Sequence, residues 1–253
     1  MTAGVVREAT GEYLTEVGPG IKKSELVPAG PYAENMSVHQ FNLEAGASID
    51  LTDTTHDQYL YLLDGEAEFH VDGQQEIGHE ASATFAQAGE KFTVSATSLG
   101  TSFVLAQVPA PVTPWADQLK KSTSGQREYF TKIGASELVA ATGDREFQVL
   151  FNVDNGSRGA TMFVGFIPSS GAPQHYHLYD EVCVIVRGSG ALHTPDHPEQ
   201  ILRKGSGFRV SNRYLHAIHN PNPEDLWILG IFRPEGSAAA AFYPDGRPAP
   251  VSK

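Results

Sequence analysis

Two histidines and a glutamate in the second half of the chain have the residue types and the spacing of metal ligands. They are His175, His177 and Glu181, and a third histidine, His216, follows further along the chain. Alternate side chains of a β-strand share one face, so positions 175, 177 and 181 are expected to point the same way. Two or three intervening strands would bring His216 beside them. Three imidazoles and one carboxylate can hold a divalent ion and leave coordination positions open to water or substrate.

Two tyrosines are further candidates for this site. Tyr179 shares the inward phase of the ligands, and Tyr214 shares the phase of His216. Either phenol would serve as a hydrogen-bond donor or an acid–base group, and the alternative is that both rings only fill space. We therefore take Glu181, Tyr179 and Tyr214 as candidate catalytic residues. Cys183, the single cysteine, lies in an apolar run and is expected to be a buried structural thiol.

The elements that must position these residues read as strands. Short runs rich in Val, Ile, Phe and Tyr recur along the chain between Gly, Pro, Asn and Asp, and long helical periodicity is missing. This pattern is typical of an antiparallel sandwich or barrel. The stretch 109–125 contains three prolines before a polar run, and we interpret it as an interdomain connection with one or two helical turns.

The second half of the chain repeats the first in outline. Residues 58–65 align with residues 181–188, and in both halves a second strand, a turn containing Gly and another strand follow. Each half has the size of one small barrel. We therefore expect two domains, an N-terminal lobe of residues 1–121 and a C-terminal lobe of residues 122–253.

These motifs resemble those of the cupin superfamily. Its first motif has the form G-x5-HxH-x3/4-E-x6-G, which the second half matches from His175 to Gly188, with Ser169 in place of the opening glycine. Its second motif, G-x5-PxG-xx-H-xxx-N, is matched in spacing from Gly205 to Asn220, with Ser211 and Arg213 in place of proline and glycine. The resemblance implies an all-β fold of two tandem cupin barrels, that is, double-stranded β-helices or jelly rolls, forming a bicupin.

The first half keeps this frame but lacks the ligands. Thr52 and Thr54 stand where the two histidines of the motif belong, Gln58 replaces the glutamate, and Phe92 replaces the last histidine. Neutral Thr and Gln compete poorly for a divalent ion and Phe cannot ligate one. We therefore expect about one metal ion per chain, held by the C-terminal lobe. Iron is expected first, and Mn, Ni, Cu and Zn are alternatives.

The resemblance implies metal-dependent chemistry on a small molecule. A site of three histidines and one glutamate is similar to that of quercetinase-like and acireductone-type dioxygenases, so the first expectation is a dioxygenase acting on an enolic or phenolic substrate. The alternatives are a non-oxidative metalloenzyme, such as an isomerase, lyase or aminohydrolase, and a cupin that binds a small molecule without catalysis.

Composition limits the partners. The 253 residues include 30 acidic and 18 basic ones, a formal net charge of −12, without long basic runs, so no nucleic-acid partner is expected. The chain shows no secretory signal and no apolar stretch long enough for a membrane span, and a single cysteine fits the reducing cytoplasm. Val182, Val184 and Val186 have an outward phase and are too apolar to face water. We expect the N-terminal lobe to cover them in an intrachain pseudo-dimer, with a further homodimer as an open alternative.

Overall fold

A computed structural model describes residues 3–9, 13–31, 34–111 and 127–251. Its regular structure is β-strand apart from short turns such as the 3-10 helix η3 (Val153–Asn155), so the expected all-β class is confirmed. Among these residues, no helix has the length and apolar character needed to cross a bilayer. The boundary between residues 121 and 122 and most of the expected interdomain connection, residues 112–125, lie outside the described residues, whereas Pro109 ends β10.

Two sheets are built mainly from the first half of the chain. The larger has the order β1 (Leu14–Gly18), β2 (Ile21–Val27), β3 (Ser37–Leu43), β10 (Thr101–Pro109), β5 (His56–Asp64), β8 (Ser82–Ala86), β11 (Phe130–Lys132). The smaller has the order β4 (Ser48–Asp50), β9 (Phe92–Ala96), β6 (Glu66–Val71), β7 (Gln74–His79).

Two further sheets come from the second half. The larger has the order β12 (Val139–Ala140), β13 (Glu146–Phe151), β14 (Thr161–Ile167), β21 (Leu226–Arg233), β16 (Asp180–Arg187), β19 (Gly207–Val210). The smaller has the order β15 (Ala172–His175), β20 (His216–His219), β17 (Ser189–Thr194), β18 (His197–Arg203).

The strand order of the two halves is the same. The run β3-β10-β5-β8 corresponds to β14-β21-β16-β19, and β4-β9-β6-β7 corresponds to β15-β20-β17-β18. In each half the larger and smaller sheets enclose an apolar core, which contains Leu60, Phe69 and Phe103 in the first half and Ile185, Leu192 and Phe208 in the second. The internal repeat inferred from residues 58–65 and 181–188 is therefore a repeat of topology.

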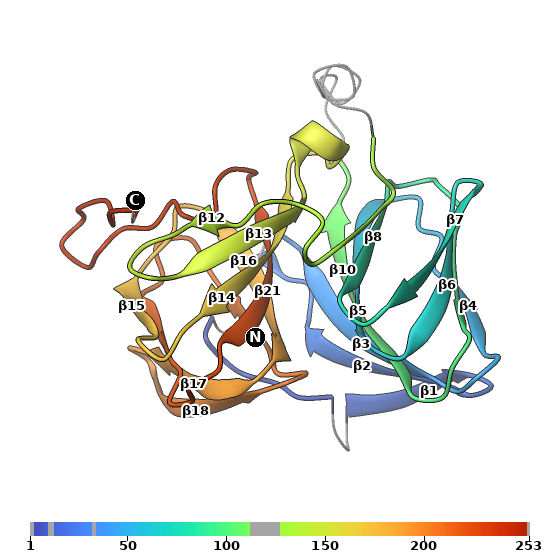
Figure 1. Cartoon of the computed structure of the whole chain (residues 1–253), viewed down its shortest axis with the longest axis horizontal. Helices are drawn as coiled ribbons and strands as arrows, with labels where there is room; N and C mark the ends of the chain where they lie inside the picture. Colours follow the sequence, from blue (N-terminus) through green and yellow to red (C-terminus); the bar gives the residue numbers. More distant parts are fainter. Residues whose placement is uncertain (1–2, 10–12, 32–33, 112–126, 252–253) are drawn as a thin grey trace.

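The two larger sheets pack against each other through their outer faces (Figure 1). Val182, Val184 and Val186 lie in one buried cluster with Tyr59, Phe85 and other side chains of the first half. The apolar outward face of β16 is therefore covered within the chain. Removing this apolar surface from water contributes about 25 cal/mol per Å².

Each half also contributes backbone to the other. Arg7, near the N-terminus, forms an antiparallel bridge with Gly207 at the start of β19. In the opposite direction, β11 follows the first half in sequence but pairs with β8. These exchanges hold the two halves together through backbone hydrogen bonds as well as side chains.

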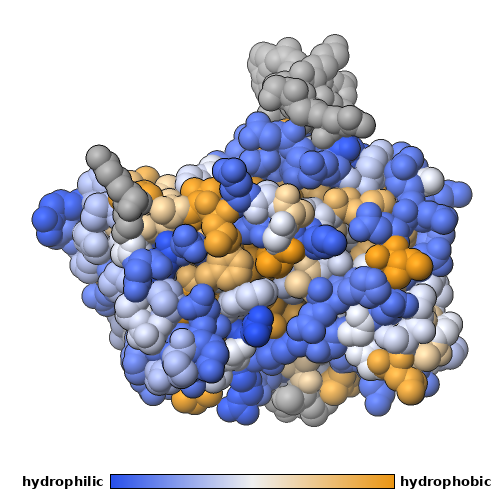
Figure 2. Space-filling view, in the orientation of Figure 1, coloured by the Kyte–Doolittle hydropathy of each residue, from blue (hydrophilic) through white to orange (hydrophobic). Residues whose placement is uncertain are grey.

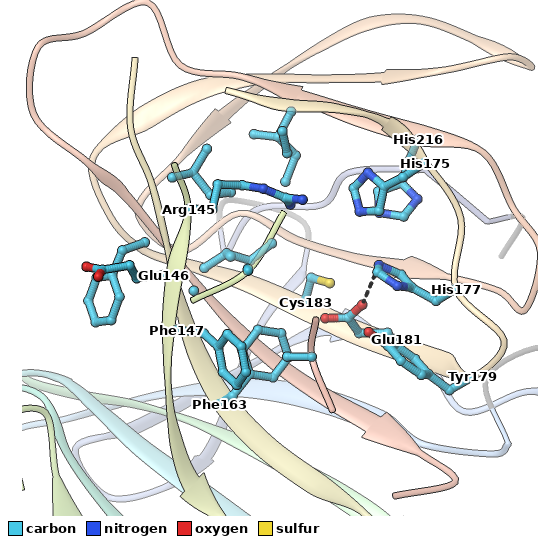
Figure 3. Close-up of a pocket in the computed structure, with 18 of the residues that line it drawn as sticks. Arg145, Glu146, Phe147, Phe163, His175, His177, Tyr179, Glu181, Cys183 and His216 are labelled. Carbon is cyan, nitrogen blue, oxygen red and sulfur yellow. Dashed lines mark ion pairs between the residues drawn. The ribbon is translucent and has the colours of Figure 1, made fainter. Parts of the chain in front are cut away.

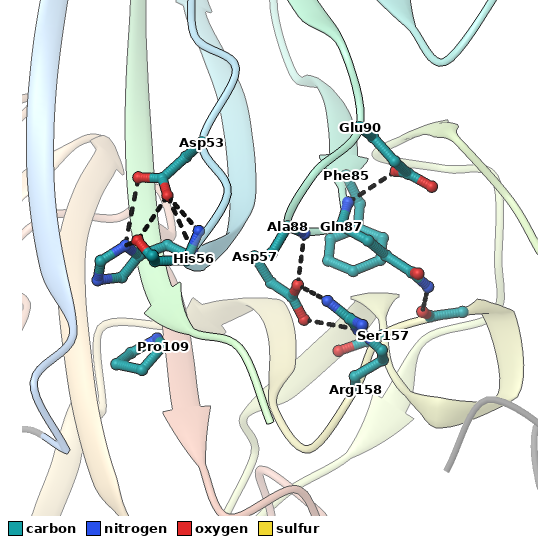
Figure 4. A network of polar contacts seen from close by, with 12 residues as sticks. Asp53, His56, Asp57, Phe85, Gln87, Ala88, Glu90, Pro109, Ser157 and Arg158 are labelled. Atoms are coloured by element: carbon teal, nitrogen blue, oxygen red, sulfur yellow. Dashed lines mark hydrogen bonds and ion pairs between the residues drawn. The ribbon is translucent and has the colours of Figure 1, made fainter. Parts of the chain in front are cut away.

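A buried ion pair between Asp57 and Arg158 also stabilises this interface (Figure 4). The Asp57 carboxylate accepts hydrogen bonds from the Arg158 Nε, at 3.0 Å, and from the same guanidinium's terminal nitrogen. It also accepts one from the Ala88 backbone N–H at 2.8 Å. Nearby, Tyr59 and Ser157 hydroxyls are 2.6 Å apart across the interface. Because both charged side chains are nearly fully buried, this pair depends on both partners being present.

The visible surface in Figure 2 is mostly hydrophilic, with apolar side chains in separate patches. The exposed apolar side chains include Ile77, Leu99, Leu138 and Ile201, which come from different parts of the chain. Isolated exposed apolar side chains of this kind are ordinary for a folded protein and do not indicate a docking surface.

The Asp57–Arg158 pair yields a test of the interface. We expect Asp57→Ala to lower the free energy of unfolding by about 3–5 kcal/mol, because it leaves the buried Arg158 guanidinium without its partner. Asp245→Ala removes the partner of Arg247 in an exposed ion pair and should change stability little. Urea unfolding followed by circular dichroism measures both variants. Equal small effects of the two substitutions would contradict this account of the interface.

Candidate metal centre

The four expected ligands come from two sheets and, for His177, from the segment between β15 and β16. His175 ends β15 in the smaller sheet, and Glu181 lies near the start of β16 in the larger one. Bends at residues 178 and 179 carry the chain between them. The expectation of one continuous strand from 175 to 181 is therefore wrong, because the chain crosses from sheet to sheet there. His216 begins β20 and pairs directly with His175.

The three imidazoles nevertheless converge (Figure 3). One ligand atom each of His175, His177 and His216 lies within 4.8 Å of the others, and all three side chains are buried. Ring centroids of His175 and His216 are 4.3 Å apart, and those of His175 and His177 are 4.8 Å apart. Such spacing suits three nitrogens directed at one ion.

Backbone carbonyls set the orientation of each ring. The Nδ1 of His175 donates to the Pro173 carbonyl oxygen at 2.6 Å, and the Nδ1 of His216 donates to that of Tyr214 at 3.0 Å. The Nδ1 of His177 donates to the Ala240 oxygen at 3.2 Å. A carbonyl can only accept, so each Nδ1 carries the hydrogen and each Nε2 keeps a free lone pair for a metal.

Glu181 lies beside the three imidazoles but is not part of the group whose ligand atoms lie within 4.8 Å of one another. Its Oε2 is 3.8 Å from the Nε2 of His177, and its carboxyl group hydrogen-bonds the Cys183 thiol. Gly230 on the neighbouring strand β21 leaves room for it, because a Cβ there would lie 2.4 Å from the Glu181 Oε1. The expected structural role of Cys183 gains a detail: its buried thiol contacts the candidate carboxylate ligand.

Burial decides the protonation of the site. It lowers the pKa of His177 to about 3 and that of His216 to about 4, and it lowers the pKa of His175 well below its ordinary value. The neighbouring imidazoles lower the pKa of His175 and His177 further. Burial raises the pKa of Glu181 to about 8. Near neutral pH the histidines are thus neutral and ready to ligate, whereas Glu181 must release a proton to do so.

The cavity in front of the imidazoles is small, and most of its lining side chains are apolar. Its volume of about 60 Å³ corresponds to roughly four water-sized spheres. Phe147, Phe163, Phe208 and Ile228 contribute to its walls, and Ala238 from the C-terminal segment lies at its edge. Only a small ligand fits in this cavity beside an ion.

One cation lines the same cavity. The Arg145 guanidinium points toward His175 and His216 in Figure 3, and its Nε donates to the Thr142 carbonyl at 2.9 Å. Burial lowers the pKa of Arg145, but guanidinium stays charged at neutral pH. Sequence patterns alone do not indicate this residue, because Arg145 precedes β13 and has no fixed spacing to the histidine motif.

The two candidate tyrosines differ in position. Tyr179 lines the cavity, with its ring stacked at 4.6 Å on His177 and at 4.0 Å on Phe232. Its hydroxyl is buried without a hydrogen-bond partner among the described residues, and burial raises its pKa well above the ordinary value. Tyr214 does not line the cavity and lies against Gly4 instead.

A turn explains the displacement of Tyr214. The expected shared phase with His216 assumes one strand, but β20 begins only at His216, and Arg213 has a left-handed φ of 60°. Alternation does not extend through such a turn. Arg213 thus takes a backbone conformation that favours glycine, at the position where the cupin motif has glycine.

The corresponding positions of the first half offer no such ligand set. Gln58 is buried on β5, and its Nε2 donates to the Leu51 carbonyl. Phe92 is fully buried on β9, and Thr52 lies between β4 and β5. Among the described residues, the group of histidine, cysteine and carboxylate side chains close enough to hold an ion is that of the second half.

Comparison with known proteins identifies the fold. No protein-family model matches this chain, and no curated protein matches it in sequence. Among solved structures, oxalate decarboxylase from Bacillus subtilis is similar at 13% identity with a TM-score of 0.70, over 94% of this chain and 79% of that one.

Two further structures agree. A protein from Pseudomonas aeruginosa described as glyoxylate-induced has 11% identity and a TM-score of 0.77, over 94% of this chain and 91% of that one. A cupin 2 conserved barrel domain protein from Leptotrichia buccalis has 13% identity and a TM-score of 0.57, over 92% and 98%. The chain therefore has a cupin-type fold.

The raised pKa of Glu181 generates a prediction about metal binding. Below pH 8 the metal-free protein holds this carboxyl protonated, so binding a divalent ion must release its proton. We expect the affinity to rise about tenfold per pH unit between pH 5.5 and 7.5, because one proton is released and the histidines are already neutral. Competition with a chromophoric chelator, corrected for its own titration, measures this slope.

Glu181→Gln is the matched control for this slope. It removes the titrating group while keeping the size of the side chain, so binding should weaken and the pH dependence should flatten. Identical slopes for the two proteins would show that Glu181 is not a ligand.

Proposed function

We propose that the chain is a two-lobed cupin metalloenzyme that holds one divalent ion in its C-terminal lobe and acts there on a small anionic substrate. The observation that carries this proposal is the set of three buried imidazoles, each oriented by a backbone carbonyl, that lines the same cavity as Arg145. In this proposal residues 122–253 carry the site, and residues 1–121 form a lobe that packs against them as a pseudo-dimer. A reducing compartment such as the cytoplasm suits the free Cys183 thiol.

The donor set fits a metal ion. Neutral imidazoles and one carboxylate accept Fe, Mn, Ni, Cu or Zn, and iron remains the first candidate. A divalent ion held by His175, His177, His216 and Glu181 would supply a Lewis acid for an enolate or carboxylate oxygen.

The protein's own side chains then select and orient the substrate. Arg145 is the cation of the cavity, so it would bind an anionic group through charge-assisted hydrogen bonds. The Tyr179 hydroxyl lacks a partner among the described residues and is free to donate to a substrate oxygen. The phenylalanines of the wall exclude bulk water, which strengthens both interactions.

For the reaction we carry forward two candidates. Dioxygen-dependent cleavage of an enolic or phenolic compound follows from the motif, and the cavity of about 60 Å³ favours a small enolic acid over a polycyclic phenol. Non-oxidative chemistry on a small carboxylate is supported by Arg145 and by the similarity to oxalate decarboxylases. Both candidates require an anionic substrate beside the ion.

Turnover with and without oxygen tests this proposal. The protein loaded with Fe(II) or Mn(II) should convert a member of a panel of small enolic and carboxylic acids. Oxygen uptake would assign it to the first candidate reaction, and turnover under argon would assign it to the second. No turnover with any metal under either atmosphere would contradict enzymatic function and favour a binding protein.

Arg145→Met tests whether Arg145 binds an anionic group of the substrate. Losing charge-assisted hydrogen bonds to the substrate should lower kcat/KM about 10- to 100-fold. Arg247→Met, at an exposed arginine that pairs with Asp245, is the control and should leave kcat/KM unchanged. Unchanged kcat/KM in Arg145→Met would contradict an anionic substrate at this position.

A further inference from the structure

The N-terminal half contains a second groove of about 280 Å³ that no part of the proposed function uses. It is lined by residues of β1, β2, β3, β4, β5 and β10 and of the segment that follows β4. Gln58 on β5 corresponds to Glu181 on β16, because both strands have the same neighbours in their sheets. Its lining side chains include Lys23, His39, Phe41, Leu51, Gln58 and Leu105.

Two buried polar atoms at this groove have no partner among the described residues. They are the Oε1 of Gln58, on a side chain 2% exposed, and the Nδ1 of His39, on a side chain 8% exposed. The Gln58 amide cannot turn to satisfy its oxygen, since its Nε2 already donates to the Leu51 carbonyl. A buried polar atom left without a hydrogen bond costs about 1–3 kcal/mol. A ligand that donates hydrogen bonds to this groove would recover that cost.

His39 is neutral, and its tautomer follows from its surroundings. Burial, followed by the nearby Lys23, lowers the pKa of His39 to about 4. Its Nε2 faces a Glu25 carboxylate oxygen at 3.8 Å, which favours the hydrogen on Nε2 and leaves Nδ1 as an acceptor. Gln58 Oε1 and His39 Nδ1 are therefore two acceptors beside the groove, and neither has a hydrogen-bond partner among the described residues.

Lys23 adds a positive charge without an ion-pair partner within 4 Å among the described residues. Its ammonium lies over the Phe41 ring, 5.6 Å from the centroid, and burial lowers its pKa. Two charged carboxylates, Asp50 and Asp53, also line the groove, and their oxygens already accept hydrogen bonds. Asp53 accepts from the backbone N–H groups of Thr55 and His56, and Asp50 accepts from that of Thr52.

A metal ion does not fit these groups. Lys23 would repel a cation, and the Gln58 amide is a weak ligand for one. An anion suits the ammonium, while Phe41, Leu51 and Leu105 offer an apolar wall for aliphatic carbon atoms.

We propose that this groove is a metal-free binding site for a small hydroxylated carboxylate. The carboxylate pairs with Lys23, and hydroxyl groups donate to Gln58 Oε1 and His39 Nδ1. The N-terminal lobe has thus exchanged the ligands of a metal for the polar groups of an organic acid site. This inference stands independently of the proposed enzymatic function.

Nuclear magnetic resonance of histidine-labelled protein tests the site directly, because the His39 ring reports on the groove and not on the metal centre. The probes are L-lactate, glycerate and L-malate, with sodium chloride as the control for ionic strength. We expect at least one acid to shift the His39 ring signals saturably with a millimolar or lower Kd. Propanoate, which lacks the hydroxyl group, should bind at least about fivefold more weakly than lactate.

Substitutions on one strand make the test specific. Lys23→Met should weaken binding about tenfold or more, because it removes the cation while keeping the length of the side chain. Lys22→Met changes the adjacent, exposed lysine of β2 and should bind as the unaltered protein does. Thermal unfolding checks that both variants are folded, and Gln58→Leu provides a second variant of the groove.

The proposal is overturned by either of two results. One is the absence of a His39 shift with all three acids at about 10 mM, ten times a millimolar Kd. The other is equal binding by Lys22→Met, Lys23→Met and Gln58→Leu, which would locate any bound acid elsewhere.

Discussion

The candidate metal centre depends on three hydrogen bonds from imidazole Nδ1 groups to backbone carbonyls. The carbonyls belong to Pro173, Tyr214 and Ala240, so two lie two residues before the histidine that they hold and the third comes from the C-terminal segment. Each hydrogen bond fixes the tautomer with the hydrogen on Nδ1 and leaves the Nε2 lone pair available to bind a metal ion. Burial keeps the rings neutral. The site is thereby organised for a cation before any ion arrives, and the surrounding sheets serve to hold these backbone groups in place.

The back-to-back packing of the two larger sheets helps to hold these backbone groups in place. Valines of β16 lie in one buried cluster with aromatic side chains of β5 and β8, and the buried Asp57–Arg158 pair joins the same two halves. Glu181 lies on the same strand as those valines, with its side chain on the opposite face. A substitution that weakens the packing between the halves would therefore also displace Glu181, because β16 carries both the interface valines and Glu181.

Much of this arrangement could be predicted from local sequence rules. Alternation of apolar residues indicates strands, and the spacing of the three histidines predicted that they converge. In the structure the three imidazoles share one cavity, with Glu181 beside them. Arg145 could not be found in this way, since its place depends on how β13 packs over the site. Tyr214 was wrongly assigned a shared phase with His216, because a left-handed turn interrupts the strand. Local periodicity predicts faces within strands, but not which distant segment lies opposite or where a turn resets the phase.

Anomalous X-ray diffraction at the absorption edge of the bound metal would test the central claim most directly. The account predicts one peak per chain, about 2.0–2.2 Å from the Nε2 atoms of His175, His177 and His216 and from one carboxylate oxygen of Glu181. The N-terminal groove around Gln58 and His39 should show none. A peak in that groove, or an ion bound elsewhere while the three imidazoles stay empty, would contradict the assignment of the metal centre to the C-terminal lobe.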